Sequence, residues 1–243
     1  MKLLFVADLH YSLKQFDWLL AEAPKFDVVS IGGDLLDLWS RLDFGVQITV
    51  VEKYLHQLRE KTLLLVSSGN HDGDSRNEAG ESVAQWLIEA KTEQLVVDNE
   101  SVLVGEVLIT VCPWWDGPLS RGQLEEFLAR ESTKPRRRWI WLHHAPSAGS
   151  PTSWTGKGDA GDECLRAWIE RFQPDAVLSG HIHGAPFYEK GSWVDRIGTT
   201  WVFNPGRQIG PYPAHLRLDL NALTAEWISL EERSIKQLAF ADR

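Results

Sequence analysis

Short apolar runs recur along this chain, and each is followed at once by polar residues. The runs span residues 2–6, 26–31, 62–67, 139–142 and 175–178. Their length and nearly continuous apolar character are typical of buried strands. Between them, apolar residues recur at helical spacing, most clearly at 46–61, which predicts amphipathic helices packed on a sheet. This alternation of strands and helices predicts an α/β fold.

The remaining segments extend this pattern without adding a second domain. Short runs at 95–97, 102–104 and 107–111 predict an antiparallel section, and the alternating residues 216–220 and the run 227–230 predict closing strands. Residues 147–161 are rich in Ser, Gly, Pro and Thr, which is typical of a lid or binding loop and equally of a plain mobile excursion. With no repeat or linker, 243 residues are expected to form one domain, 1–243.

Composition narrows the function classes. A formal net charge of -9 argues against a broad basic face for extended nucleic acid, although a small phosphate ester remains compatible. The one basic cluster, residues 136–138, is expected to be solvated. The two cysteines, Cys112 and Cys164, indicate neither a disulfide framework nor a thiolate metal site. The apolar run at 2–6 is too short for a signal peptide or a membrane span, so we expect a cytoplasmic protein.

Polar side chains follow the ends of successive buried strands. These residues are Asp8, His10, Asp34, Asn70, His71, His143, His144, His181 and His183. In open α/β sheets such strand ends border one crevice, so the side chains are expected to converge there. Taken alone, Asp8 and His10 are equally compatible with a capping aspartate and a surface histidine. Asp37 could likewise cap the next helix.

The chemistry of this set points to metal ions. Imidazoles, carboxylates and one amide without a thiolate suit Mn²⁺, Fe²⁺, Zn²⁺ or Mg²⁺. The residues outnumber the ligands that one ion needs. Two ions roughly 3.5 to 4 Å apart would clamp a phosphoryl group for in-line displacement, which is the apparatus of a hydrolase.

The motifs together resemble the calcineurin-like metallophosphoesterase family. They are Asp8-x-His10, Gly33-Asp34-x-x-Asp37, Gly69-Asn70-His71-Asp72, His143 and Gly180-His181-x-His183, with a family-like turn at Asn204-Pro205-Gly206. The resemblance implies a four-layer α/β/β/α sandwich of two mixed sheets with a dinuclear metal centre at one edge.

The resemblance also implies a role for each matching residue. One ion would be held by Asp8, His10 and His183 with Asp34 as a bridge, and the other by Asp34, Asn70, His143 and His181. His71 would be the catalytic proton donor, oriented by Asp37, and a bridging hydroxide would be the nucleophile. His143 is preferred to His144 as the ligand because it follows the apolar strand directly, and the alternative assignment stays open.

Departures from the sequence patterns of other family members favour a small bacterial-type phosphodiesterase. Manganese is the expected metal. Leu38 and Trp39 follow Asp37 where protein phosphatases carry arginine and glycine. Arg76, His144 and Trp154 are candidate substrate contacts, although Arg76 could as well be a solvent-facing loop residue. A phosphomonoesterase of the same family is the alternative enzyme, and a catalytically silent interaction scaffold is the alternative outside enzymes. The sequence gives no indication of the oligomeric state.

Overall fold

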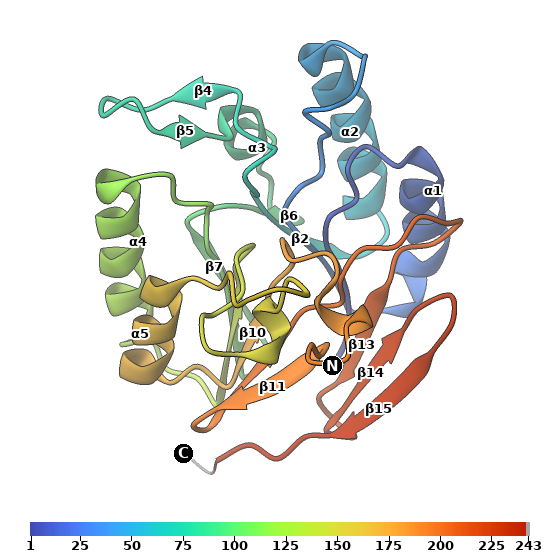
Figure 1. The fold of residues 1–243 in the computed structure, drawn as a ribbon. Helices are drawn as coiled ribbons and strands as arrows, with labels where there is room; N and C mark the ends of the chain where they lie inside the picture. The colour runs from blue at the N-terminus through green and yellow to red at the C-terminus, as the bar shows by residue number, and fades with distance from the viewer. Residues whose placement is uncertain (242–243) are drawn as a thin grey trace.

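The computed structural model describes residues 1–241, which form two β-sheets packed face to face between two layers of helices (Figure 1). Within these residues the larger sheet has seven strands, in the spatial order β15 (Arg233–Gln237), β14 (Thr224–Ile228), β13 (His215–Asp219), β1 (Lys2–Val6), β2 (Val28–Gly32), β3 (Leu63–Ser67) and β6 (Leu95–Val96). Strands β1, β2, β3 and β6 are parallel, and β13 to β15 are antiparallel.

The second sheet is also mixed. Its six described strands follow the order β11 (Val194–Ile197), β12 (Thr200–Phe203), β10 (Ala176–Leu178), β9 (Arg138–Leu142), β8 (Val107–Val111) and β7 (Glu100–Val104). Strands β8, β9, β10 and β12 are parallel, whereas the edge strands β7 and β11 are antiparallel to their neighbours. A separate hairpin joins β4 (Ser75–Arg76) to β5 (Ser82–Val83).

The helices form the outer layers, α1 and α2 on one side and α4 and α5 on the other (Figure 1). The described α-helices are α1 (Leu13–Glu22), α2 (Phe44–Arg59), α3 (Gln85–Glu89), α4 (Pro118–Glu131) and α5 (Glu163–Phe172), and the short 3₁₀ helices are η1 (Ala23–Lys25), η2 (Pro151–Ser153) and η3 (Ala185–Phe187). Aspartates begin two of the helices: Asp43 accepts from the main-chain N–H groups of α2, and Asp162 does so for α5. No helix within residues 1–241 combines the length and apolar character needed to cross a membrane.

Within residues 1–241, three apolar clusters hold the four layers together. One lies between the sheets and includes Phe5, Ile140 and Leu142. The others lie between a sheet and its helices, as where Trp139 and Trp141 pack near α4 and α5. Because adjacent residues of a strand point to opposite faces, strand β9 serves both kinds of cluster. The predicted α/β/β/α architecture of two mixed sheets is confirmed.

Several predicted details were wrong. Strand β6 does not join the antiparallel section expected for residues 95–111; it pairs parallel with β3, and the chain then crosses to the second sheet, where β7 and β8 form a hairpin. Strands β11 and β15 were not predicted, because Val194–Ile197 and Arg233–Gln237 carry polar residues suited to exposed edge strands. The loop 147–161, whose role stays a prediction, contains η2 and has a bridge between Trp154 and Asp159.

A buried histidine at the start of β13 gives a pH-dependent stability. Burial lowers the pKa of His215 to about 4, and its surroundings include Arg217, Glu22 and Glu226. Its Nδ1 donates to the Pro213 carbonyl (2.9 Å), so the folded protein keeps it neutral. The unfolded chain takes up the proton near pH 6.5. Stability from this group is therefore complete above pH 6.5 and is lost as the pH falls towards 4.

We expect His215→Gln to flatten the pH dependence of stability. Between pH 7.5 and 5, wild type should lose about 2 kcal/mol of unfolding free energy more than the variant. Urea denaturation at both pH values measures this difference. The histidines elsewhere contribute equally to both proteins and cancel, so parallel pH dependences would contradict the assignment.

Candidate metal centre

The loops that follow β1, β2, β3, β9 and β10 meet at one edge of the two sheets, and their polar side chains form three groups. The first group contains Asp8, His10, Asp34 and His183, the second contains Asp34, His144 and His181, and the third contains His10, Asp37 and His71. Within each group the possible ligand atoms lie within 4.8 Å of one another. The convergence expected from strand-end placement is therefore present in the structure.

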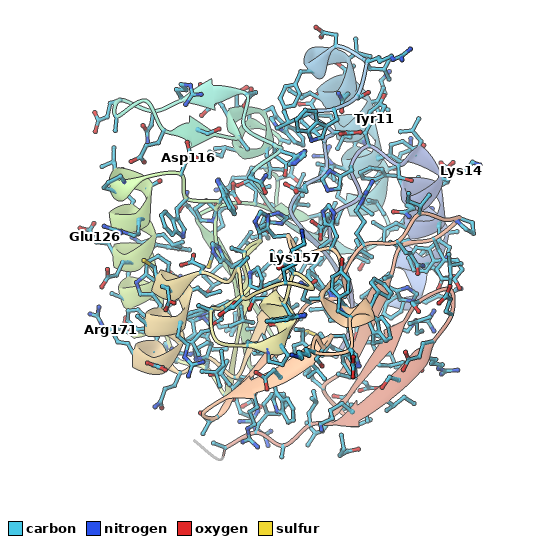
Figure 2. The ribbon with its side chains drawn as sticks, in the orientation of Figure 1. Tyr11, Lys14, Asp116, Glu126, Lys157 and Arg171 are labelled. Atoms are coloured by element: carbon cyan, nitrogen blue, oxygen red, sulfur yellow. The ribbon has the colours of Figure 1, made fainter. Side chains whose placement is uncertain are left out.

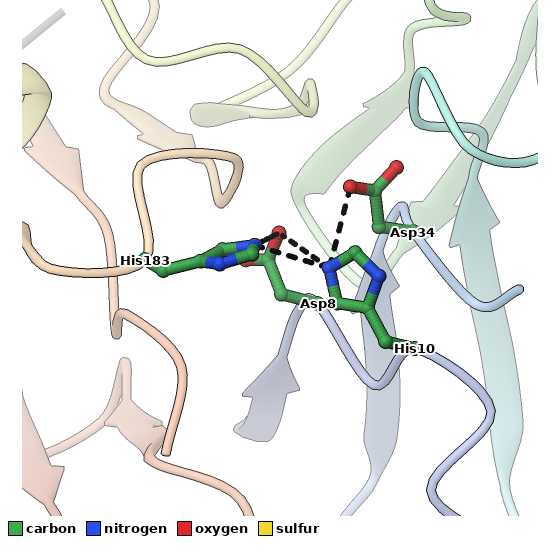
Figure 3. A group of neighbouring side chains, drawn as sticks. All are labelled: Asp8, His10, Asp34 and His183. Carbon is green, nitrogen blue, oxygen red and sulfur yellow. Dashed lines mark hydrogen bonds and ion pairs between the residues drawn. The ribbon is translucent and has the colours of Figure 1, made fainter. Parts of the chain in front are cut away.

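The first group is compact and largely buried (Figure 3). The Nε2 atoms of His10 and His183 lie 3.0 Å apart. A carboxylate oxygen of Asp34 lies 3.6 Å from His10 Nε2, and one of Asp8 lies 3.3 Å from His183 Nε2. Asp8 is held in place because both of its oxygens accept from the main-chain N–H of His181, at 3.0 and 3.1 Å. Two imidazole nitrogens and two carboxylates thus face one point.

The second group shares Asp34 with the first. In this group the carboxylate of Asp34 contacts His144, whose Nε2 lies 3.2 Å from Asp34 Oδ2. The opposite ring nitrogen, Nδ1, donates to the Gly32 carbonyl at 2.6 Å, which fixes the ring and leaves Nε2 facing the carboxylate. The ring centroid of His181 lies 5.1 Å from that of His144. Asp34 therefore lies between two clusters of imidazoles.

His143, which the sequence analysis prefers to His144 as a metal ligand, lies outside the three groups in the structure. Its Nε2 lies 3.7 Å from Asp162 at the start of α5, and it belongs to none of the three groups. Strand alternation explains this placement. His143 continues the face of Trp139 and Trp141, which is turned towards the helices, whereas His144 continues the inter-sheet face of Ile140 and Leu142. The sequence could not show which face of this run was the inner one.

His71 lies beside both groups. Its main-chain N–H donates to Asp34 Oδ1 at 2.9 Å, and its ring centroid lies 4.6 Å from that of His10. The ring nitrogen Nδ1 accepts a long hydrogen bond from the Leu38 main-chain N–H (3.4 Å). Asp37 reaches the same group, and one of its oxygens accepts from the Trp39 N–H at 2.9 Å. With Nδ1 as acceptor, the neutral ring carries its proton on Nε2.

Asn70 contributes an amide oxygen to this edge of the sheets. Its Oδ1 is buried and has no hydrogen-bond partner among the described residues. The preceding Gly69 is required for close packing: a Cβ there would lie 2.2 Å from Asp34 Oδ1 and 2.9 Å from His144 Nε2. Buried oxygens rarely remain unpaired, which makes Asn70 suited to an ion.

Asp72 has a structural role that the sequence did not reveal. Its carboxylate is fully buried, and main-chain N–H groups occupy both of its oxygens. It accepts from the main-chain N–H groups of Asp34, Leu35, Leu36 and Gly69 at 2.8–3.0 Å. Burial, together with the nearby Asp34 charge, raises the pKa of Asp72 to about 7. This carboxylate ties the loop after β2 to the loop after β3.

The residues predicted to contact substrate are only partly at this site. Arg76 lies in the exposed β4–β5 hairpin, where it donates to the Gly80 carbonyl at 2.7 Å. Trp154 lies beneath Lys190, 5.9 Å from its ammonium nitrogen. Trp114 lies closer, with its ring centroid 5.4 Å from that of His181, and together with Trp115 it lines a cavity of about 410 Å³ beside that histidine.

The backbone is strained at four members of the two groups. Asp8, His10, Asp34 and His181 have φ values of 56°, 41°, 54° and 66°, in the left-handed region. Each such residue costs on the order of 1–3 kcal/mol and persists only where its surroundings enforce it. Strain concentrated on these side chains indicates that their positions matter for function.

The electrostatics of the two groups fit a cation. Burial lowers the pKa values of His10 and His181 to about 4, so both rings are neutral at pH 7, the form that can bind a cation. Burial alone would also lower the pKa of His144, but the Asp34 and Asp8 carboxylates raise it to about 10. The same pairing holds the pKa of Asp34 well below its usual range, although burial opposes it. The site therefore favours positive charge between Asp34 and His144, and its donor atoms suit a divalent ion.

Comparisons with known proteins agree with this chemistry. A family model described as calcineurin-like phosphoesterase matches residues 1–185. A search of curated proteins found no match. Among solved structures, the protein TT1561 of Thermus thermophilus is 13% identical with a TM-score of 0.61, and the match covers 97% of this chain and 98% of that one. A purple acid phosphatase from yellow lupin (Lupinus luteus) seeds is 15% identical with a TM-score of 0.60, over 98% of this chain and 52% of its own.

Proposed function

We propose that this chain, which belongs to the calcineurin-like phosphoesterase family, hydrolyses a small phosphate ester, with a diester preferred, by means of two divalent cations. The observation that carries the proposal is the position of Asp34, which is shared by two groups of candidate ligands. Manganese is the proposed metal, with iron, zinc or magnesium as alternatives of suitable chemistry.

The proposed ligands follow the two groups. Asp8, His10, Asp34 and His183 would hold one ion, and Asp34, Asn70, His144 and His181 the other. His144 replaces His143 in this assignment because its Nε2 faces Asp34. When bound, the ions would supply Lewis acidity towards the phosphoryl group and towards water.

The proposed proton donor is His71. The imidazolium form of His71 would pass its Nε2 proton to the leaving oxygen of the ester and so return to the neutral ring. Asp37 lies in the same group and would orient the ring and stabilise its protonated form. The hydrogen bond from the His71 main chain to Asp34 couples the position of the donor to that of the shared carboxylate.

Three broader proposals accompany this function. Both sheets share one apolar core, which supports a single domain over 1–243, of which residues 242 and 243 lie outside the described part. The substrate is a small molecule, since the net charge of -9 disfavours extended nucleic acid. A cytoplasmic location is consistent with the two free cysteines.

Hydrolysis of two nitrophenyl esters tests the function. Metal-stripped protein is assayed on bis-p-nitrophenyl phosphate and p-nitrophenyl phosphate before and after Mn²⁺ is added. Metal-dependent cleavage with the diester preferred supports the proposal. A monoester preference would keep the reaction class and replace the substrate class. Protein that holds two ions but cleaves neither ester nor a wider panel of phosphate esters would instead be a scaffold.

We expect substitutions of His143 and His144, the two histidines after β9, to differ in their effect on metal content. His144→Gln removes a proposed ligand, so the affinity for one of the two ions should fall at least about 100-fold. His143→Gln changes a residue paired with Asp162 and should leave two ions per chain. Mass spectrometry of dialysed protein gives the stoichiometry. Loss of an ion in the His143 variant alone would restore the original sequence-based assignment.

A further inference from the structure

The turn after β12, residues 204–207, contacts the candidate metal centre but has no part in the function described so far. Asn204 is fully buried, and its amide nitrogen donates to the carbonyls of Thr152 (2.9 Å) and Ile182 (3.1 Å). Its amide oxygen accepts from the Gly206 N–H at 2.8 Å. The turn is therefore fixed to the loops on both sides of it.

This turn fixes Arg207 beside a proposed metal ligand. The main-chain N–H of Arg207 donates to the His183 carbonyl at 3.0 Å. The approach depends on Gly206, which has a φ of +69° and whose Cβ, if present, would lie 2.7 Å from that carbonyl oxygen. A side chain at position 206 would push the turn away from His183.

The guanidinium of Arg207 is half-buried and makes no hydrogen bond or ion pair with any residue from 1 to 241. The main chain of Arg207 is hydrogen-bonded to that of His183, a member of the first group, so the side chain starts beside the candidate metal centre. Among residues 1–241, the positive charge that follows His183 in this turn thus has no carboxylate bonded to it.

We propose that Arg207 binds a non-bridging oxygen of the substrate phosphoryl group, an inference that rests on the proposed function of the same site. The planar guanidinium can donate two parallel hydrogen bonds to a phosphoryl oxygen pair, a geometry that lysine cannot reproduce. The position of Arg207 beside His183 puts its charge on the side of the first group of ligands. It takes the role that the sequence suggested for Arg76, which instead bonds to Gly80.

Binding of inorganic phosphate to the metal-loaded full chain tests this proposal without requiring turnover. In calorimetry, Arg207→Gln should weaken phosphate binding by about 10- to 100-fold, and Arg207→Lys by less, because it keeps the charge and loses the fork. Arg171→Gln is the matched control. Arg171 pairs with Glu125 on the outer side of the helical layer, away from the site, so phosphate affinity should not change there (Figure 2).

A second readout separates binding from folding and catalysis. The thermal midpoint and the two-ion stoichiometry of Arg207→Gln should match wild type, and with an ester substrate the KM should rise more than kcat falls. Unchanged phosphate affinity in Arg207→Gln overturns the proposal, as does loss of an ion together with phosphate, which would show a structural role for the turn.

The failure of this inference is distinguishable from that of the proposed function. If wild type binds phosphate through Arg207 but hydrolyses no ester, the anion site stands and the enzyme assignment fails. If wild type hydrolyses esters and Arg207→Gln binds phosphate normally, the enzyme assignment stands and the role of Arg207 is rejected.

Discussion

His71→Ala is expected to keep both ions and to lower turnover by about 10²- to 10⁴-fold, the usual contribution of general acid catalysis. The alanine removes the Nε2 proton but leaves the main-chain hydrogen bond from residue 71 to Asp34. The measurement is kcat at saturating substrate, together with metal content. The loss should be larger for an alkyl ester than for a nitrophenyl ester, since a good leaving group needs little protonation.

A matched control for His71 is His56, an exposed histidine on α2 that pairs with Glu60. His56→Ala should keep the wild-type rate with both substrates. If His71→Ala also hydrolyses the alkyl ester at the wild-type rate, the assignment of His71 as proton donor is wrong. An equal loss on both esters would move its role from proton transfer to charge stabilisation.

Asp34→Asn is expected to weaken both metal sites together. Asp34 Oδ2 lies 3.2 Å from His144 Nε2 and 3.6 Å from His10 Nε2, so the change removes a negative charge from both groups at once. The amide is nearly the same size and tolerates the left-handed backbone at this position, so the effect should come from charge. Metal titration should show two weakened ions, and activity should fall with them.

Asp8→Asn provides the comparison for Asp34. Asp8 belongs only to the first group, so its replacement should weaken one ion more than the other. If Asp34→Asn kept two ions at wild-type affinity, Asp34 would not be the shared ligand. If both variants gave the same pattern, the division into two groups would need revision.

The sequence was sufficient for the architecture because the strands that position the site are short, apolar and closely followed by their polar residues. Asp8, Asp34 and His71 could be located this way from strand ends alone. The choice between His143 and His144 could not be made, since it depends on which face of β9 meets the other sheet. That face is set by packing across the molecule and not by the local pattern.

Arg76 and Arg207 show a second limit of prediction from the sequence. Each follows a glycine-containing turn in sequence, yet only Arg207 has its main chain bonded to a member of the first group, His183, in a turn that Asn204 ties to two distant loops. The role of Asp72 could not be predicted from the sequence either. Its carboxylate could be an ion ligand or a partner of main-chain N–H groups, and only the approach of the loop after β2 decides between them.

The position of β1 within its sheet has a consequence for folding during synthesis. β1 begins at residue 2, yet one of its two neighbours is β13, which pairs Lys2 with Asp219. Until the ribosome has made that segment, one side of β1 exposes unpaired N–H and C=O groups, which promote association between chains. A chain that stopped at residue 185, where the family match ends, would carry Asp8, His144 and His183 but leave that edge open. The nascent protein therefore depends on its last strands for protection from aggregation.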